Sequence, residues 1–350
     1  MNFKSKQLQE FRKSKALLID VRSPDEYYKG HLPNSINIPL FDNEERKFIG
    51  KKYKNAGREK AVVEGLKIIE KKLDFLIYNF ISAEKDYIAK ENNESIIKNK
   101  IKIYCARGGM RSLSISWLLE KMNFNTFILN GGYKNYRKWV LSVFNKKQEL
   151  IVVGGKTGTG KTRLLNHLKK NNYQVIDLEF LANHRGSTFG GLGMKEQPSN
   201  EQFENLIAEN IDKLNQKEKI FLEAESSNIG KCRIPFEFFK QMKKAPRIEI
   251  IQTQENRIRE LISTYSVFSK NDLRNSVNRL TKRLGPKRTK NALDSIDKEN
   301  WEGVCRAVLE YYDKCYEYEL KDKLNVTTIK INGKDENEII QLIINKSLSL

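Results

Sequence analysis

Cysteine, proline and histidine are scarce in this chain of 350 residues, which contains 4 Cys, 7 Pro and 3 His. The four cysteines stand at unrelated spacings, which fit neither a disulfide framework nor a Cys-x-x-Cys zinc pattern: Cys105, Cys232, Cys305 and Cys315. No apolar run approaches the length that crosses a bilayer, and the N-terminal segment MNFKSKQLQEFRK lacks the apolar stretch of a secretory signal. We therefore expect free thiols and a cytoplasmic protein with no membrane partner.

Acidic residues are few relative to basic ones: 44 Asp and Glu stand against 64 Lys and Arg, which gives a formal net charge of +20. Such a charge favours a polyanionic partner such as nucleic acid. A chain rich in Lys, Asn and Ile also fits the bias of an AT-rich genome, so the clustering of charge is more informative than its total. The share of hydrophobic residues, 39%, excludes a disordered or fibrous protein.

Short apolar runs in the first third alternate with polar stretches long enough for helices, which predicts a parallel sheet with crossover helices. The runs are ALLID, SINIPL, IKIYC and TFILN. A charged stretch at about residues 43–99 interrupts them, with apolar residues at helical spacing: Val62, Leu66, Ile69, Leu73 and Ile77. We predict a first α/β domain over residues 1–145 with this stretch as a helical insertion.

The alternation restarts with ELIVVGG, YQVIDLE, KIFLEAE and RIEIIQT, and the chain ends in a strand, TTIKIN, and an amphipathic helix containing EIIQLII. A charged helical block intervenes at about residues 255–320. These patterns predict a second α/β domain over residues 146–350 with a basic helical extension. The fold class is therefore α/β, with two parallel-sheet domains.

Residues 155–162, GKTGTGKT, match the phosphate-loop pattern, with an apolar strand before them and a helix-compatible segment after them. In such a loop the glycines let successive amides point at phosphate oxygens, and the helix N-terminus favours negative charge. The expected phosphate-binding residues are Gly155, Gly158, Gly160, Lys161 and Thr162, with the Thr162 hydroxyl as a ligand of Mg²⁺. Glu223 and Glu225 end a neighbouring strand, where they would serve as Mg²⁺ ligands or as acid/base groups. The pattern leaves open whether the ligand is ATP, GTP or another diphosphate ester.

Residues 104–112, YCARGGMRS, place Cys105 after an apolar strand and before a helix-compatible segment. Amide donors, a helix N-terminus and nearby arginines lower the pKa of a thiol, so Cys105 is the predicted catalytic nucleophile. The anion-binding residues of the loop are Arg107, Gly108, Gly109 and Arg111. This geometry suits a phosphoryl group or a chalcogen carried on sulfur.

Two further segments are candidates for contact with nucleic acid. His184, Arg185 and Gly186 begin a glycine-rich loop that is able to approach an anion or a base. A basic run without acidic residues spans residues 273–292 and supplies seven candidate RNA-binding residues: Arg274, Arg279, Lys282, Arg283, Lys287, Arg288 and Lys290. Nearby tyrosines either stack on unpaired bases or pack in the core: Tyr311, Tyr312, Tyr316 and Tyr318.

Three segments in order resemble the hallmark segments of a rhodanese domain: LIDVRSPDEYYKGHLPNSINIPL, YCARGGMRS and LNGGYKNYRKW. The resemblance implies that Asp20 and Arg22 help to fix the fold, that His31 lies in a structural turn, and that Cys105 carries sulfur or selenium. The first domain is accordingly expected to be rhodanese-like and the second P-loop NTPase-like.

The fusion of the two domains resembles the tRNA 2-selenouridine synthases over nearly the whole chain. Similar stretches include FDNEERKFIGKKYKNAG, DLEFLANHRGSTFGGLG, SSNIGKCRIP, RLTKRLGPKR and EYYDKCYEYEL. The resemblance implies an enzyme that converts the wobble 2-thiouridine of tRNA to 2-selenouridine. Its implied co-substrates are selenophosphate and geranyl diphosphate, its intermediate is S-geranyl-2-thiouridine, and an enzyme that supplies selenophosphate is a candidate partner.

Two other functions stay open at the level of sequence. The first is a rhodanese-type sulfurtransferase coupled to an RNA-binding NTPase. The second is a cysteine phosphatase, because Cys105 and Arg111 have the Cys-x5-Arg spacing.

Overall fold

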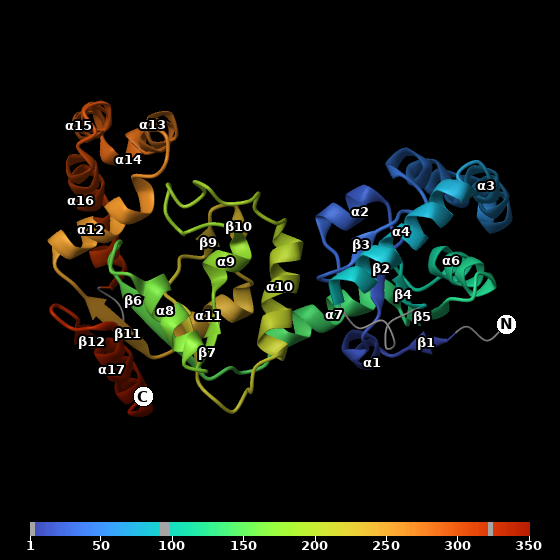
Figure 1. Cartoon of the computed structure of the whole chain (residues 1–350), viewed down its shortest axis with the longest axis horizontal. Coiled ribbons are helices and arrows are strands. Elements are labelled where there is room, and N and C mark those ends of the chain that lie inside the picture. Colours follow the sequence, from blue (N-terminus) through green and yellow to red (C-terminus); the bar gives the residue numbers. More distant parts are fainter. Residues whose placement is uncertain (1–3, 92–98, 321–324) are drawn as a thin grey trace. The chain divides into compact units, whose positions relative to one another are not determined.

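The computed structural model of the chain describes residues 4–91, 99–320 and 325–350, and Figure 1 labels its elements. The chain divides into two compact units, Met1–Ser142 and Val143–Leu350. Each unit contains a five-stranded sheet in which paired strands run parallel, and helices connect the strands. The predicted α/β class with two parallel sheets is confirmed.

Unit 1 has the sheet order β1-β5-β4-β2-β3. Its strands are β1 (Ser5–Lys6), β2 (Leu17–Asp20), β3 (Ile36–Asn37), β4 (Lys100–Tyr104) and β5 (Asn125–Leu129). Its helices are α1 (Leu8–Lys13), α2 (Pro24–Lys29), α3 (Asn43–Glu70), α4 (Leu73–Glu91), α6 (Met110–Lys121) and α7 (Gly132–Phe144), the last of which crosses the unit boundary. Asp20 pairs with Tyr104 in register, so the segments that follow β2 and β4 leave the sheet at the same edge.

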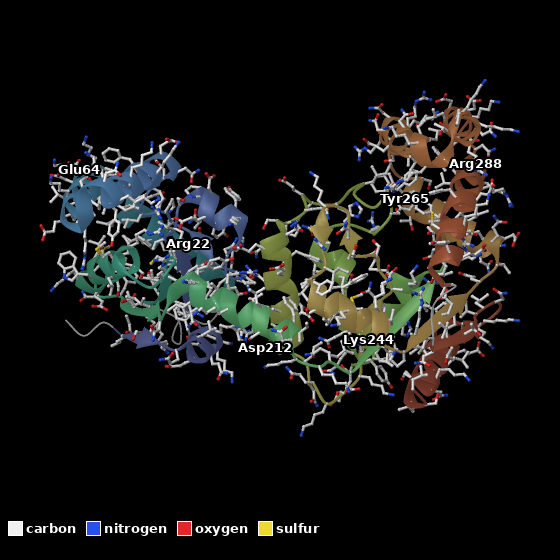
Figure 2. All side chains as sticks on the ribbon, turned by 180° about the vertical axis from the view of Figure 1, so that it is seen from behind. Arg22, Glu64, Asp212, Lys244, Tyr265 and Arg288 are labelled. Atoms are coloured by element: carbon white, nitrogen blue, oxygen red, sulfur yellow. The ribbon has the colours of Figure 1, made fainter. Side chains whose placement is uncertain are left out.

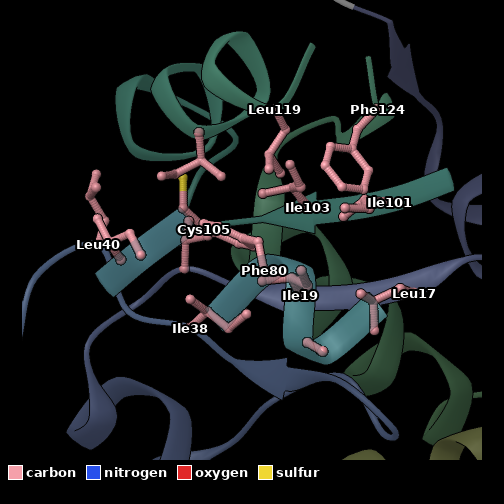
Figure 3. Close-up of a cluster of buried hydrophobic side chains, with 14 of the residues drawn as sticks. Leu17, Ile19, Ile38, Leu40, Phe80, Ile101, Ile103, Cys105, Leu119 and Phe124 are labelled. Carbon is pink, nitrogen blue, oxygen red and sulfur yellow. The ribbon is translucent and has the colours of Figure 1, made fainter. Parts of the chain in front are cut away.

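The core of unit 1 forms where aliphatic side chains of β2 and β4 pack against Phe80 of α4. Figure 3 shows Cys105 within this cluster, beside side chains such as Leu40 and Ile103. The strand thus places the Cβ of Cys105 against apolar side chains, and the sulfur faces the loop that follows.

The helical insertion consists of α3 and α4, and residues 92–98 of the predicted stretch lie outside the described part of the chain. Its apolar face differs from the expected one, because Val62 and Leu66 are exposed whereas Ala61 and Gly65 are buried. The physical reason is that the stretch is not one continuous helix: α3 is kinked at Gly57, where φ is +86°, and it ends at Glu70 before α4 begins at Leu73. Val62 and Leu66 therefore do not share one helical face with Leu73 and Ile77. In α4 the buried positions are Leu76, Phe80 and Ala83.

Unit 2 has the sheet order β12-β11-β6-β8-β7. Its strands are β6 (Leu150–Gly155), β7 (Gln174–Ile176), β8 (Ile220–Glu223), β11 (Arg247–Ile251) and β12 (Val326–Lys330). An additional antiparallel pair, which the sequence patterns do not predict, joins β9 (Asn228–Ile229) and β10 (Cys232–Arg233). Helices α8 (Lys161–Lys170), α9 (Leu178–Ala182), α10 (Asn200–Asp212), α11 (Phe236–Lys244) and α17 (Glu336–Leu348) accompany the sheet.

The helical extension of unit 2 runs from residue 254 to residue 320. It contains α12 (Gln254–Tyr265), α13 (Lys270–Arg279), α14 (Thr281–Leu284), α15 (Pro286–Asp297) and α16 (Trp301–Leu320). These helices have their own core, in which Leu273, Val277 and Val308 are buried together with Phe189 from the glycine-rich loop. Among the described residues, no helix combines the length and the apolar character that crossing a bilayer requires.

Candidate functional site

The cysteine loop joins β4 to α6 and encloses a buried thiol. Cys105 is 3% exposed, and its Sγ lies 3.3 Å from Oγ of Ser112 in the first turn of α6. Burial by itself raises the pKa of the Cys105 thiol, but the Ser112 hydroxyl, the Arg107 backbone amide and the charge of Arg111 outweigh it and lower that pKa. The loop therefore stabilises the thiolate, the nucleophilic form, relative to that of an ordinary cysteine.

Arg111 is held by a carboxylate of unit 1. Its Nη1 and Nη2 donate to the two carboxylate oxygens of Glu26 at 2.6 and 3.1 Å. Burial would raise the pKa of Glu26, but the hydrogen bonds and charge of Arg111 lower it to about 2. Arg107, in contrast, is exposed and faces the thiol through its backbone amide. The two arginines of the loop thus have different roles, which their spacing does not reveal.

The segment LNGGYKNYRKW fixes the backbone of the cysteine loop. The amides of Tyr133 and Lys134, in the first turn of α7, donate to the carbonyls of Cys105 and Ala106 at 2.9 Å each. Gly132 has a φ of +57°, and a Cβ on it would lie 2.4 Å from the Cys105 carbonyl oxygen. A side chain at position 132 would therefore displace the loop. Gly108 and Gly109 complete the turn between Arg107 and α6.

Asp20 and Arg22 form a buried ion pair at the edge where the cysteine loop leaves the sheet. Nε of Arg22 donates to Oδ2 of Asp20 at 2.9 Å, and its Nη2 donates to the Gly30 carbonyl at 2.7 Å. The Arg22 guanidinium also lies 3.8 Å from the ring centroid of Tyr133. His31 stacks on Tyr27 at 3.9 Å within the turn after α2. These residues brace the loop and do not contact the thiol.

The phosphate loop connects β6 to α8 in unit 2, and the side chain of a lysine lies inside it. Lys161 Nζ donates to the Gly155 carbonyl at 2.7 Å and lies 3.4 Å from Glu223. Gly158 has a φ of +84°, and a Cβ there would lie 2.7 Å from the Arg257 carbonyl oxygen. The loop is therefore packed closely beneath α12. Gly155 and Gly160 also have positive φ, as the pattern requires.

Three carboxylates gather beside the phosphate loop: Glu179, Glu223 and Glu225, with ligand atoms within 4.8 Å of one another. The Thr162 hydroxyl lies 3.1 Å from Oε2 of Glu179 and 3.0 Å from Oε2 of Glu223. Burial and the neighbouring charge of Glu223 raise the pKa of Glu179 to about 8. The structure thus brings the predicted Thr162, Glu223 and Glu225 together.

Glu179 is a site residue that the sequence patterns do not single out. It lies in α9, directly after β7, and is 6% exposed. A signal is present in the sequence, since acidic residues follow a strand that ends at the same sheet edge as the phosphate loop. The phosphate-loop pattern directs attention to the acids after β8 and not to those after β7.

The glycine-rich loop, which begins at His184, packs against this carboxylate cluster. A Cβ on Gly186 would lie 2.9 Å from Glu179 and 3.2 Å from Glu225. Arg185 is turned toward the loop itself, because its Nη1 donates to the Leu192 carbonyl at 3.0 Å. Burial lowers the pKa of His184, whose ring lies beside Gly191. Gly186 is therefore the member of the predicted trio that borders the cluster.

A second site residue that no sequence motif indicates connects the helical extension to the phosphate loop by hydrogen bonds. Arg257 of α12 is 3% exposed, and its Nε donates to the Thr157 carbonyl at 2.8 Å. Its Nη1 and Nη2 donate to Asp313 of α16 at 2.9 and 2.6 Å. Lys156 Nζ pairs with Glu317 of α16 at 2.6 Å. Helices from the extension therefore shape one side of the loop.

The four tyrosines considered for base stacking have unequal surroundings. The Tyr316 hydroxyl donates to Glu249 at 2.7 Å and accepts from Arg247 at 2.6 Å, and it also accepts from the Gly155 amide. The Tyr312 hydroxyl accepts from the Thr188 amide at 3.1 Å, and Tyr311 packs on the Tyr312 ring. Tyr318 is 77% exposed. Tyr316 and Tyr312 thus serve internal packing, and Tyr318 stays available for stacking.

The basic run lies on α13, α14 and α15, and the fold supplies acidic partners that its sequence lacks. Arg274 pairs with Asp297, and Arg288, labelled in Figure 2, pairs with Glu310. Five members of the run are exposed: Arg279, Lys282, Arg283, Lys287 and Lys290. The positive surface is therefore smaller than the run of seven residues suggests.

Comparisons with known proteins agree with both units. Residues 4–139 match the rhodanese-like domain, and residues 148–348 match the tRNA 2-selenouridine synthase AAA domain. A tRNA 2-selenouridine synthase of Sulfurovum sp. is 34% identical over 91% of this chain and 92% of the relative. That of Nitrosomonas europaea is 34% identical over 71% of this chain and 63% of the relative, so the match spans less than two thirds of that protein.

Among solved structures, a tRNA isopentenylpyrophosphate transferase of Bacillus halodurans is similar over 58% of this chain and 98% of that chain, at 14% identity and a TM-score of 0.35. So remote a likeness says nothing of activity. The matches to both domains, in the same order and over nearly the whole chain, show that this chain belongs to the tRNA 2-selenouridine synthase family.

Proposed function

We propose that the chain is a tRNA-modifying transferase that converts wobble 2-thiouridine to 2-selenouridine, using geranyl diphosphate and selenophosphate. The observation that carries the proposal is a buried thiol of lowered pKa in a rhodanese-type loop, on the same chain as an intact phosphate loop. Membership of the family supports the same function, since its relatives carry the name of this activity.

The first step is assigned to the phosphate loop. The sulfur of 2-thiouridine attacks carbon 1 of geranyl diphosphate, the new S–C bond forms, and the C–O bond breaks with its electrons on pyrophosphate. The proton on N3 of the base is lost, which leaves neutral S-geranyl-2-thiouridine. Lys161 and the loop amides stabilise the charge that develops on the departing pyrophosphate. The carboxylates beside Thr162 are candidates to accept the proton.

The second step is assigned to the cysteine loop. Its amides and Arg111 bind the tetrahedral selenophosphate anion, and Cys105 transfers the selenium: its thiolate attacks phosphorus, the S–P bond forms, and the P–Se bond breaks to release selenide. Water then hydrolyses the S–P bond, which releases phosphate and restores the thiol. At carbon 2 of the base the C–Se bond forms, the C–S bond breaks, and geranylthiol leaves. Selenophosphate already holds selenium at the level of selenide, so the overall exchange needs neither an oxidant nor a reductant.

Mg²⁺ is the metal that the phosphate-loop pattern implies, and the donor set fits it. Thr162, Glu179 and Glu223 present hard oxygen atoms close together, and Glu225 adds another carboxylate. Burial and then the neighbouring charge of Glu223 raise the pKa of Glu179, and a bound cation would favour its charged form. When bound, Mg²⁺ would neutralise charge on the diphosphate.

The tRNA is expected to contact the exposed basic residues of the extension. These residues lie on consecutive helices of one unit: Arg279, Lys282, Arg283, Lys287 and Lys290. Such residues attract the phosphate backbone and position the tRNA without reading its sequence.

The test is mass analysis of tRNA nucleosides after incubation with geranyl diphosphate and selenophosphate. Lys161→Ala is expected to reduce S-geranyl-2-thiouridine formation by about 10²-fold or more, because the substitution removes a positive charge that stabilises the leaving group. Lys169→Ala, on the exposed side of α8, is the matched control. Cys105→Ala should still geranylate the base but form no 2-selenouridine.

Two results would overturn this proposal. Wild-type protein that forms neither nucleoside, yet hydrolyses ATP in response to tRNA, would favour the sulfurtransferase coupled to an NTPase. Hydrolysis of an aryl phosphate that depends on Cys105 would favour the phosphatase.

A further inference from the structure

One face of α16 contacts residues 155–157, the first three of the phosphate loop. Tyr316 accepts a hydrogen bond from the first amide, Glu317 pairs with the side chain of the second residue, and Asp313 holds Arg257 against the carbonyl of the third. Residues three and four apart are neighbours on a helix, so the three side chains of α16 share one face. The same helix packs against α12 and α15 (Figure 1). The start of the loop is therefore supported by a helix that the phosphate-loop pattern does not include.

The Tyr316 hydroxyl uses all of its hydrogen-bonding capacity. It donates to Oε1 of Glu249 at 2.7 Å, and it accepts from Nη2 of Arg247 at 2.6 Å and from the Gly155 amide. A hydroxyl has one proton and two lone pairs, so no capacity remains for a further partner. Burial and the neighbouring charge of Glu249 raise the pKa of Tyr316, which keeps its proton in place at neutral pH. Three groups of the protein thus fix the position of this oxygen.

Gly154, which precedes the phosphate-loop pattern, makes room for these charged groups. It pairs in register with Glu249 of the neighbouring strand β11. A Cβ on Gly154 would lie 2.5 Å from Nε of Arg247 and would overlap the Glu249 carboxylate. A side chain at position 154 would therefore displace both partners of the Tyr316 hydroxyl. The need for glycine at this position comes from the hydrogen-bond network and not from contact with phosphate.

Gly155 is held on both sides. Its amide donates to the Tyr316 hydroxyl, and its carbonyl accepts from Nζ of Lys161 at 2.7 Å. Its φ is +154°, and glycine has the greatest backbone freedom of all residues. If the amide had no partner, the loop would vary between conformations, and ordering it would reduce the free energy of ligand binding. The Tyr316 hydroxyl removes this cost before a ligand arrives.

We propose that Tyr316 is a positioning residue for the reaction at the phosphate loop: its hydroxyl fixes Gly155, and with it the direction of the loop amides and the starting position of Lys161. Tyr316 acts through the backbone, since the protein itself uses the whole capacity of its hydroxyl. The inference rests on the proposed function for the identity of the diphosphate, and it assigns a residue of the helical extension to that step.

Tyr316→Phe tests the inference, because it removes the hydroxyl and keeps the ring. The probe is pyrophosphate, and calorimetry of the full chain with Mg²⁺ gives its affinity. The substitution is expected to weaken pyrophosphate binding by about tenfold, which corresponds to the loss of one hydrogen bond. Tyr173→Phe is the matched control, since Tyr173 is 37% exposed and precedes β7, at the sheet edge opposite the phosphate loop. Equal affinities of wild type and Tyr316→Phe would overturn the inference.

A double-mutant cycle separates positioning from a general loss of stability. Lys161→Ala acts on the carbonyl side of Gly155, and Tyr316→Phe acts on its amide side. The two effects should therefore be non-additive, so that Tyr316→Phe weakens pyrophosphate binding by only about twofold or less when Lys161 is already alanine. The same factor in both backgrounds would show that Tyr316 acts on stability alone, which also overturns the inference.

Hydrogen exchange of the Gly155 amide provides a measurement that needs no variant. Its bond to the Tyr316 hydroxyl predicts exchange about tenfold or more slower than that of the exposed turn residue Gly333. NMR of the glycine-labelled wild-type protein gives both rates. If the Gly155 amide exchanges as fast as that of Gly333, the inference fails even where Tyr316→Phe does not fold.

The inference and the proposed function fail in different ways. A Tyr316→Phe protein that binds pyrophosphate and geranylates tRNA as wild type does would remove the positioning role and leave the proposed function standing. Weaker pyrophosphate binding by Tyr316→Phe, together with no geranylated tRNA from the wild-type protein, would keep the positioning role and remove the proposed reaction.

Discussion

Among single residues, Cys105 shows how few groups decide the chemistry of one sulfur atom. It is buried against apolar side chains, which alone would suppress its ionisation. The Ser112 hydroxyl is the largest of the influences that favour the thiolate. We therefore expect this one hydroxyl, in the first turn of α6, to influence the reactivity of the Cys105 thiol.

Ser112→Ala is expected to raise the pKa of Cys105 and to slow its alkylation at neutral pH by about tenfold, because the thiolate loses a hydrogen bond that stabilises its charge. The measurement is the pH profile of Cys105 alkylation by iodoacetamide, followed by mass analysis. Ser114→Ala is the matched control, since that hydroxyl is exposed and donates to the Met110 carbonyl. An unchanged profile in Ser112→Ala would contradict the assignment.

The surroundings of Glu179 act in the opposite sense to those of Cys105, because they disfavour the charged form of the side chain. The folded protein keeps a proton on this carboxyl up to a pKa of about 8, whereas the unfolded chain loses it near 4.5. Between these values the folded state binds more protons, so the free energy of unfolding falls as pH rises.

Glu179→Gln should remove this contribution when Mg²⁺ is chelated. Relative to wild type, the variant is expected to gain on the order of 1 kcal/mol or more between pH 5 and pH 8. Urea unfolding at both pH values measures the difference, and Glu237→Gln on the exposed face of α11 is the control. A difference between variant and wild type that stays the same at pH 5 and pH 8 would show that Glu179 does not titrate in this range.

Among the elements, two helices of the extension meet the phosphate loop through one guanidinium. Arg257 of α12 joins the Thr157 carbonyl to Asp313 of α16, and it is buried. A buried charge that loses its partner is costly, so the loop and the extension are both held in the positions that keep this guanidinium paired. The contact therefore couples the order of the loop to that of the extension.

Arg257→Met is therefore expected to lower the free energy of unfolding of unit 2 by on the order of 3 kcal/mol, since Asp313 loses its partner. Hydrogen exchange of α12 and α16 should accelerate, and urea unfolding gives the magnitude. Arg306→Met is the matched control on α16, because its pair with Glu302 is exposed and contributes little. Equal effects of the two substitutions would show that the buried pair contributes no more than an exposed one.

For the molecule as a whole, the net charge of +20 is the property that favours association with a polyanion. The exposed residues of the basic run concentrate part of this charge on α13, α14 and α15, whereas Arg274 and Arg288 are balanced by Asp297 and Glu310.

Neutralising Lys282 and Arg283 together should reduce the slope of log affinity for tRNA against log salt by about 0.7 to 0.9 for each phosphate that is no longer neutralised. Affinity measured over a range of salt concentrations gives that slope. Lys244→Ala, an exposed lysine of α11 (Figure 2), should leave it unchanged. A slope that is the same in the double variant and in wild type would remove the run from the tRNA interface.

The amino-acid order alone is enough to predict the local features of this protein. The glycines and Lys161 of the phosphate loop, Cys105 at the end of a strand, and the alternation of strands and helices all depend on neighbours in the chain. The resemblance to the tRNA 2-selenouridine synthases likewise rests on short continuous segments, so it can be recognised in the sequence.

The three-dimensional packing, in contrast, determines which distant groups share a site. Glu179 joins Glu223 and Thr162 because β7 and β8 end at one sheet edge, and Arg257 reaches Thr157 because α12 packs over the loop. The pairing of Arg288 with Glu310 and the burial of Tyr316 also depend on segments far apart in the chain. Periodicity and motif spacing describe one segment at a time, so they contain no information on such contacts.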